Sequence, residues 1–485
     1  MSASSSLRAS ISRERISSSR PASSWGSTED VIKKVLAAAA GGGATAELFV
    51  EDRRSTALRL DDSRVEDVAS GVDIGAGVRV ISGDRASYAY TNVLTLEALL
   101  DTAGAARAGL GRGGEQTAVD LRRAGPPVKH PVRLPPEEVG AEDKAAVLRV
   151  ADDAARATGA EVRQVVASYS DVRQKILVAS SEGTLAEDDR TRVRFAVQVV
   201  AARDGEIATG FEAPGHSGGY ELLERFPAAE VGSKAAAKAV RMLEARPSPA
   251  GQFPVVLAPG SGGVLIHEAC GHGLEADTLV KHASVYADRR GERFGSDSVT
   301  IVDDGADVGA WGSVGVDDEG TPAQRTVLFD QGVLVGHLSD LRSARQIGHP
   351  PTGNGRRQSY AYLPIVRMTN TYLLPGPDDP DAILESVERG VYAATFAGGE
   401  VNPATGNFVF GMAEAYMIED GAITHPIKGA TLIGNGPEVL GAIDAVASDF
   451  DRKEGVCGKD GQAAPVTNGM STVLLAAMTV GGTEA

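Results

Sequence analysis

The spacing of apolar residues along the first part of the chain predicts helices that alternate with antiparallel strands. Residues 27–40 (STEDVIKKVLAAAA) show helical spacing behind Ser27, a residue type suited to cap a helix. Alternation of apolar and polar residues over 46–90, broken by turns, predicts a series of strands, and a second helix is predicted over 95–110. We assign residues 27–125 to an N-terminal α+β domain.

The same two patterns return after a linker near residues 124–138, a stretch that contains five prolines. Residues 141–157 have helical spacing, residues 162–212 alternate like a meander, and residues 234–245 predict a closing helix. We assign residues 138–246 to a middle α+β domain.

Glycine becomes dense after this point, and the predicted strands become short. Residues 250–485 are therefore predicted to form a strand-rich C-terminal domain, which contains both cysteines of the chain, Cys270 and Cys457. The predicted fold class is α+β, with two units of helices and antiparallel strands followed by this strand-rich domain.

The start of the chain differs in composition from the rest. Residues 2–24 are dominated by Ser, Arg and Ala, with Glu14 as the single acid, so we predict that residues 1–26 form a disordered extension. The same bias is typical of organelle transit peptides, and import into an organelle is the alternative.

Charge and cysteine content narrow the setting of the protein. A net charge of −17 argues against a surface that binds nucleic acid, and no apolar stretch is long enough to cross a bilayer. Two cysteines cannot form a disulfide framework, which indicates a reducing compartment. We predict a cytoplasmic protein with neither nucleic-acid nor membrane partners.

The segment GSGGVLIHEACGHGLEAD, residues 260–277, contains two histidines and a glutamate within a stretch of six residues. His267 and His272 are five positions apart, which leaves them about 140° apart around a regular α-helix. A π-bulge, or a helix end at Gly271 and Gly273, would bring them together as a metal site. The alternative is a helix terminus with one partly buried and one exposed histidine, and spacing by itself does not exclude it.

Further blocks of sequence carry a resemblance to a known family. They include VDDEGTPAQRTVLFDQGVL, PTGNGRRQSYAYLPIVRMTNTYLLPG, GMAEAYMIEDGAITHPIKGATLIGNG and GVCGKDGQ, within residues 255–482, and GVDIGAGVRVISGDRASYAYT in the N-terminal unit. Together with the histidine motif, this stretch resembles the TldD/PmbA family of zinc peptidases, whose active members contain HExxxH. The C-terminal domain is accordingly expected to be the metallopeptidase domain.

The resemblance implies a zinc site in this chain. It gives His267, His272 and Cys457 as the Zn²⁺ ligands and Glu268 as the catalytic carboxylate. Two imidazoles and a thiolate leave the fourth tetrahedral position open for water, which is the arrangement of a catalytic zinc. Zinc-bound water would be the nucleophile, with Glu268 as general base and then proton donor to the leaving amine.

Other polar residues are weaker candidates. Cys270 is interpreted as a packing residue, and Glu275 and Asp277 as solvated acids at a helix end, although they could instead orient a ligand histidine. His282 is expected in a surface loop.

The segment PTGNGRR predicts substrate binding through Asn354, Arg356 and Arg357, or else a loop that merely turns. GSGG and GAGVRV lack the remaining residues of nucleotide-binding motifs.

The predicted function is zinc-dependent hydrolysis of unfolded or extended peptides, with leader segments of modified peptides as one substrate class. Exposed strand edges at GNGRR and FVFGMAEAYMI are expected to bind such chains by strand addition. The alternative is a non-catalytic partner subunit, since the family contains paralogues that lack HExxxH, but the motif is intact here. The resemblance implies a dimer, with such a paralogue or with itself, and the sequence does not choose between these or identify the substrate.

Overall fold

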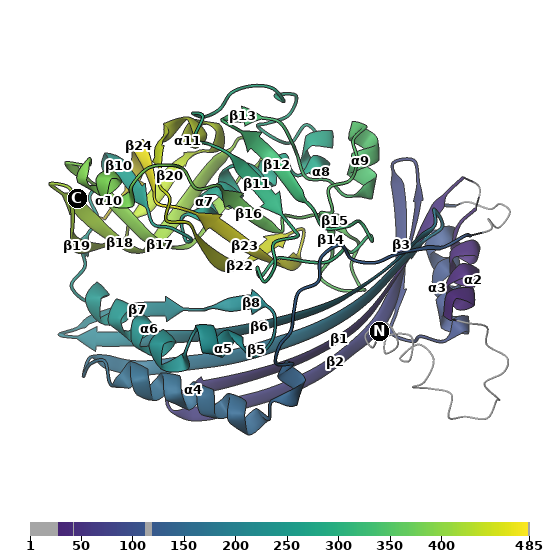
Figure 1. Cartoon of the computed structure of the whole chain (residues 1–485), viewed down its shortest axis with the longest axis horizontal. Helices are drawn as coiled ribbons and strands as arrows, with labels where there is room; N and C mark the ends of the chain where they lie inside the picture. The colour runs from purple at the N-terminus through teal and green to yellow at the C-terminus, as the bar shows by residue number, and fades with distance from the viewer. Residues whose placement is uncertain (1–27, 42, 112–118, 484–485) are drawn as a thin grey trace.

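The computed structural model describes residues 28–41, 43–111 and 119–483 of a mixed α+β protein (Figure 1). The predicted fold class is confirmed. The predicted extension over residues 1–26 and the cap at Ser27 lie outside the described residues. Within the described ranges, no helix is both long and apolar enough to span a membrane.

The first unit follows its sequence pattern closely. Helix α2 (Thr28–Ala39) precedes three antiparallel strands, β1 (Thr45–Asp61), β2 (Arg64–Ser82) and β3 (Arg85–Thr91), and α3 (Leu96–Ala108) closes the unit. The two helices and the series of antiparallel strands predicted for this unit are therefore confirmed.

The middle unit repeats this scheme, with its closing helix starting six residues before the predicted position. Its elements are β4 (Arg122–Ala124), η2 (Pro136–Glu138), α4 (Ala141–Arg156), β5 (Val162–Ser180), β6 (Thr184–Arg203), β7 (Glu206–Glu212), β8 (Gly215–Ser217), α5 (Leu222–Arg225) and α6 (Ala228–Met242). Pro227 occupies the N-cap position of α6, with φ −57° and ψ 134°, so the helix begins directly after this proline.

The two units share one eight-stranded sheet, a feature that the sequence pattern did not predict. β1 pairs with β5 in antiparallel register from Glu47 opposite Ser180 onward, which gives the order β3-β2-β1-β5-β6-β4. Leu48 and Val50 point to the face covered by the helices, whereas Phe49 points to the opposite face and packs against Val316 of the third unit. Helices α2 and α3 of the first unit and α4 and α6 of the middle unit thus cover one face of the sheet. The C-terminal unit lies over the other face (Figure 1).

The third unit contains a closed ring of strands. The ring runs β17 (Arg389–Val401), β10 (Gly251–Leu257), β24 (Val473–Gly481), β20 (Thr431–Asn435) and β18 (Asn407–Glu419), and pairing of β18 with β17 closes it. Its interior holds a large share of the apolar core of this unit.

A six-stranded sheet packs beside the ring. Its order is β13 (Val333–Leu334), β12 (Arg325–Asp330), β11 (Ile301–Asp304), β16 (Asn370–Leu373), β23 (Gln462–Met470) and β22 (Asp451–Lys459), so that β22 is the terminal strand. The remaining elements are short: β9 (Arg246–Pro247), α8 (Ala276–Val280), α9 (Leu341–Ile347), β14 (Gly355–Arg356), β15 (Ile365–Val366), α10 (Pro380–Glu385), β19 (Ala422–Lys428), α11 (Gly436–Ala442) and β21 (Ile443–Val446).

Candidate metal centre

One helical segment contains both histidines of the motif. β10 leads through a glycine-rich turn into α7 (Gly263–Ile266), which continues as the π-helical turn η3 (His267–Gly271) and the 3-10 turn η4 (His272–Leu274). The backbone N–H of His272 donates to the carbonyl of His267, a bond that spans five residues instead of four. This wider turn accommodates the extra residue of the motif, as the π-bulge interpretation predicted.

The two imidazole rings consequently lie together. Their centroids are 5.0 Å apart with ring planes at 89°, and His267 and His272 are 3% and 8% exposed. The alternative of one partly buried and one exposed histidine is therefore wrong.

Glycines allow the π-helical turn to lie close to its neighbours. A Cβ atom on Gly271 would lie 2.0 Å from Sδ of Met368, and one on Gly436 would lie 2.1 Å from the carbonyl oxygen of Ala269. The second contact is with backbone inside the turn itself, so no rotamer change could relieve it. Gly436 thus helps to define the position of the histidines.

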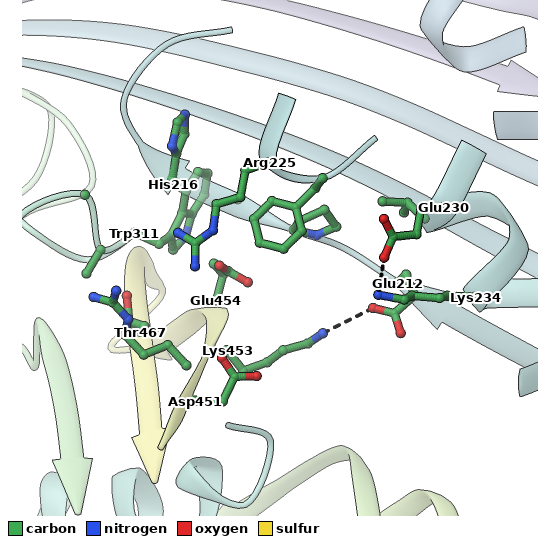
Figure 2. A pocket seen from close by; sticks show the side chains of 17 residues that line it. Glu212, His216, Arg225, Glu230, Lys234, Trp311, Asp451, Lys453, Glu454 and Thr467 are labelled. Atoms are coloured by element: carbon green, nitrogen blue, oxygen red, sulfur yellow. Dashed lines mark ion pairs between the residues drawn. The ribbon is translucent and has the colours of Figure 1, made fainter. Parts of the chain in front are cut away.

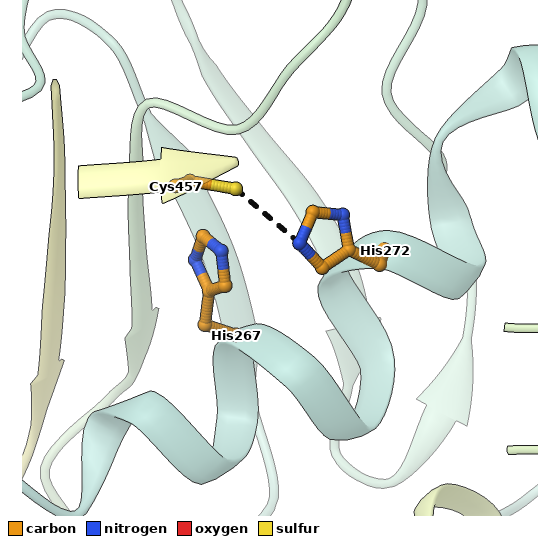
Figure 3. Close-up of side chains that lie close together, drawn as sticks. All are labelled: His267, His272 and Cys457. Atoms are coloured by element: carbon orange, nitrogen blue, oxygen red, sulfur yellow. Dashed lines mark hydrogen bonds between the residues drawn. The ribbon is translucent and has the colours of Figure 1, made fainter. Parts of the chain in front are cut away.

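Cys457 reaches the same place from β22, 185 residues further along the chain (Figure 3). Its Sγ lies 3.3 Å from Nε2 of His272, and one ligand atom from each of His267, His272 and Cys457 lies within 4.8 Å of the others. All three residues are buried. The tertiary structure therefore brings together the three residues predicted to bind zinc.

The chemistry of this cluster fits a zinc ion. Burial by itself raises the pKa of the Cys457 thiol, but the charge of His267 and hydrogen bonds from both histidines outweigh it and lower the pKa to about 4. A thiolate is the form that binds metal. Nδ1 of His267 is also buried without a hydrogen-bond partner among the described residues. Two imidazoles and a thiolate are common zinc ligands, and three protein ligands leave one position open.

Glu268 lies next to the cluster and is open to its pocket. Its Oε2 is 3.8 Å from Nε2 of His272, and the side chain is 19% exposed. Burial raises the pKa of Glu268, and the charges of His267 and His272 only partly oppose this effect. A carboxylate with a raised pKa is a better proton acceptor, as a general base requires.

Glu275 also belongs to this centre, and its interpretation as a solvated acid at a helix end is wrong. It is fully buried, not solvated, and its Oε2 lies 3.1 Å from Nδ1 of His272 and 2.9 Å from Nζ of Lys459. Burial alone would raise the pKa of Glu275, but the charges of His272 and Lys459 lower it to about 2. Asp277 also pairs with Lys459, at 2.8 Å. Since Lys459 and Cys457 share β22, these contacts tie the strand to the histidine segment.

We expect Glu275→Ala to weaken zinc binding by about 10–100-fold, because His272 loses the carboxylate that orients its ring. Competition with a chromogenic chelator measures the affinity. Asp277→Ala is the matched control, because it removes a partner of Lys459 but none of His272. Equal weakening in both variants would assign the effect to Lys459 and not to orientation of the histidine.

A pocket of about 700 Å³ opens over the cluster. Its walls are the histidine segment, the end of β17 (396–401) and β22, and it includes His267, Glu268 and Cys457. A substrate in this pocket would contact the candidate ligands and the candidate base together.

The strand edges predicted at GNGRR and FVFGMAEAYMI are not available. β14, within the first segment, is buried and paired with β15, and β18, within the second, is paired with β17 on one side and with β19 and β20 on the other. The strand-rich, glycine-dense sequence suggested exposed strands here, but it did not show which strands would lie at an edge.

The arginines of PTGNGRR lie away from the cluster. Arg357 donates to the Glu47 carboxylate at 2.5 Å and to the Asp318 carbonyl at 2.9 Å, which joins the third unit to the N-terminal sheet. Arg356 donates to the carbonyl of Met368 at 2.5 Å. Both arginines are buried, and neither lines the pocket over the cluster.

Asn354 is likewise buried, and its Nδ2 donates to the Asp303 carboxylate at 2.9 Å and to the carbonyl of Arg367 at 3.0 Å. The prediction that Asn354, Arg356 and Arg357 bind substrate is corrected accordingly. The donor atoms named above are paired within the protein itself, and the three residues hold the fold together.

Two lesser expectations agree with the structure. Cys270 is fully buried, and its Sγ donates to the carbonyl of Ile266, which suits a packing residue. His282 is 73% exposed in a turn, where its Nδ1 lies 3.5 Å from Asp288.

A second pocket, of about 230 Å³, lies between the middle unit and the start of β22 (Figure 2). Its charged side chains largely pair with one another, as in Lys234 with Glu230 at 2.7 Å and Lys453 with Glu212 at 3.6 Å. It contains none of the candidate ligands and does not include Glu268. The pocket over the histidines is therefore the candidate site.

Comparison with known proteins covers the three units. Profiles of the PmbA/TldA metallopeptidase domains match residues 46–109 (domain 1), 134–243 (central domain) and 250–482 (C-terminal domain). A Haemophilus influenzae protein named metalloprotease TldD homolog is 39% identical over 448 residues. The match covers 90% of this chain and 93% of the Haemophilus protein. A Methanothermobacter thermautotrophicus protein named metalloprotease is 36% identical over 90% of this chain and 95% of its own.

Solved structures show the same fold. A Thermotoga maritima protein, described as a proposed modulator of a DNA gyrase, superposes with a TM-score of 0.76 at 23% identity, covering 93% of this chain and all of its own. TldE from Thermococcus kodakarensis gives a TM-score of 0.70 at 19% identity, covering 89% of this chain and 96% of its own. The names of the relatives place the chain in the metallopeptidase class. It belongs to the PmbA/TldD family.

Proposed function

We propose that this chain is a zinc-dependent peptidase and the active subunit of its assembly. The observation that carries the proposal is the convergence of His267, His272 and Cys457 next to Glu268, at a pocket of about 700 Å³. A Saccharolobus solfataricus relative named zinc metalloprotease TldD homolog, 32% identical over 59% of this chain and 64% of its own, supports zinc as the metal. A non-catalytic partner would not need this set of residues.

The residues of the site divide the chemistry between them. Zinc, held by the two imidazoles and the thiolate, would supply a Lewis acid at the scissile carbonyl. Glu268 takes the proton of the attacking water on its carboxylate and returns it to the leaving nitrogen, and its raised pKa suits both transfers. Glu275 keeps Nδ1 of His272 occupied, so that Nε2 remains directed at the cluster.

We propose unfolded or extended peptides as the substrates, including leader segments of modified peptides. The candidate base and ligands are buried or mostly buried and line a pocket, so a cleavable bond must enter it. A folded protein can present such a segment only by local unfolding, which costs up to several kcal/mol.

The zinc-loaded protein is expected to cleave a permanently unfolded protein and to spare the same protein when folded. Electrophoresis of the products at matched concentrations measures the difference. A chelator-treated sample should cleave neither form, and zinc should restore cleavage. Equal cleavage of both forms would contradict the proposed substrate class, and no cleavage of either form by the zinc-loaded assembly would contradict the peptidase.

We propose that the protein is cytoplasmic and acts as a dimer, with a paralogue that lacks the motif or with itself. The similarity to TldE supports a pairing of two chains with this fold. Light scattering of the chain by itself, and of the chain mixed with such a paralogue, tests the two arrangements.

A further inference from the structure

The pocket over the cluster extends past the candidate ligands as far as β23. Asn468 on that strand lines the pocket. The start of α7 packs closely against the same stretch, since a Cβ atom on Gly263 would lie 2.6 Å from the backbone nitrogen of Gly469. His267 follows Gly263 by one turn of the helical segment, about 6 Å along its axis. The end of the pocket at Asn468 therefore adjoins the metal centre.

The side-chain amide of Asn468 has an unused hydrogen-bonding atom. The residue is 4% exposed, and its Oδ1 is buried with no hydrogen-bond partner among the described residues. A buried acceptor without a partner is uncommon in folded proteins, and a ligand or an ordered water usually completes it. Because Asn468 lines the candidate site, this atom marks a place where a group of the substrate can bind.

The side chains around this amide are apolar. Val466 lies two residues before Asn468 on the same face of β23 and is buried. Val264 and Phe396 also line the pocket, and both pack partly buried against the core of the unit. The backbone N–H of Phe396 donates to Oγ of Ser261 at 3.3 Å, which places Phe396 beside the turn before α7. One amide in apolar surroundings is the composition of a selective side-chain pocket.

This end of the pocket has space for a ligand and no charge of its own to attract one. Gly455 lies opposite Val466 on β22, and a Cβ atom there would lie 3.7 Å from Nδ2 of Asn468, so the glycine leaves room beside the amide. Lys453 lies opposite Asn468, but its Nζ is 3.6 Å from the Glu212 carboxylate and it does not line this pocket. An uncharged polar group therefore suits the position.

We propose that this end of the pocket binds the carboxamide side chain of a glutamine or asparagine residue close to the cleaved bond of the substrate. The proposal rests on the peptidase function proposed above and names a side chain that the site selects. A carboxamide donates an N–H to Oδ1 of Asn468 and accepts from Nδ2 with its oxygen, so one group pairs with both atoms. A carboxylate can only accept, an ammonium can only donate, and the thioether of methionine is a weak acceptor.

Peptides that differ at one position test this selectivity. Each peptide has a single mapped cleavage site, and Gln, Met, Glu or Lys is placed in turn at each residue on both sides of the cleaved bond. Pairs of peptides compete for the zinc-loaded wild-type assembly in one sample, which gives the ratio of their kcat/KM values. At one position, Gln should exceed Met, which has a side chain of similar length, by roughly three- to tenfold, and Glu and Lys should also fall below Gln.

Two variants of Asn468 assign the preference to its amide. Asn468→Ala should bring the ratio of Gln to Met at that position close to one. Asn468→Asp replaces the donor with a second acceptor oxygen, so the preference should move from Gln to Lys. Because each ratio compares two substrates of one sample, partial loss of zinc or of folded protein does not change it. Asn92→Ala, the same change at an exposed residue of the N-terminal unit, is the matched control and should keep the wild-type ratio.

The two proposals fail in different ways. A ratio of Gln to Met near one at every position of the wild type would overturn the carboxamide site and leave water as the partner of Oδ1. A preference for Gln that persists in Asn468→Ala would also overturn it, because another group would then select the side chain. In both cases cleavage continues and the peptidase stands. Absence of cleavage of every peptide by the zinc-loaded wild-type assembly would overturn the proposed function itself.

Discussion

Glu268→Gln is expected to lower the rate of peptide hydrolysis by about 10²–10⁴-fold while zinc content remains that of the wild type. The amide keeps the size of the side chain but cannot accept the proton of the attacking water. Glu268 is not among the three residues whose ligand atoms converge, so its replacement leaves all three candidate ligands in place. Steady-state kinetics on a defined peptide, with zinc measured on the same sample, gives both quantities.

The Glu268 variant also separates catalysis from binding. Because only proton transfer is removed, the dissociation constant for an uncleaved peptide should stay near that of the wild type. Substantial hydrolysis by the zinc-loaded variant would show that another group is the base.

Cys457→Ala is expected to lose zinc, with an affinity that falls by more than the roughly 10–100-fold typical of a residue that only orients a ligand. The variant retains two imidazoles but no thiolate, and three ligands are the usual minimum for a catalytic zinc. Metal analysis after dialysis measures the loss, and hydrolysis should fall with it. Zinc should also raise the unfolding midpoint of the wild type, because the site exists only in the folded chain, and this rise should shrink in the variant.

Cys270→Ala is the matched control for this variant. Both cysteines are buried in the same unit, but Cys270 donates its thiol to the carbonyl of Ile266, and burial raises its pKa. Its replacement should leave zinc content unchanged. Zinc retained in Cys457→Ala at the level of Cys270→Ala would remove Cys457 from the ligand set.

Much of the local structure was predictable from the sequence. The strands within 46–90 and 162–212 alternate apolar and polar residues because one face of each packs on helices, and α4 shows its helical period for the same reason. The candidate ligands His267 and His272 could also be identified from the sequence, because they lie in one short motif. The resemblance supplied Cys457, which no local pattern connects to them.

The tertiary structure decided what depends on contacts between distant segments. β1 and β5 join two predicted units into one sheet, although nothing in either strand specifies its partner. The π-helical turn was one of two alternatives by spacing, and close packing against Gly271 and Gly436 accompanies the one that forms.

The same distinction explains the site residues that sequence reasoning placed wrongly. Arg357 is of a residue type that often binds substrate. In the folded chain, however, its guanidinium donates to the carboxylate of Glu47, 310 residues away. Glu275 is of a residue type that is usually exposed to solvent. In the folded chain, however, it is buried and its carboxylate contacts His272 and Lys459. Residue type and spacing determine what chemistry a side chain can perform. Its burial and its partners, which only the folded chain brings together, determine whether it performs that chemistry on a ligand or on the protein itself.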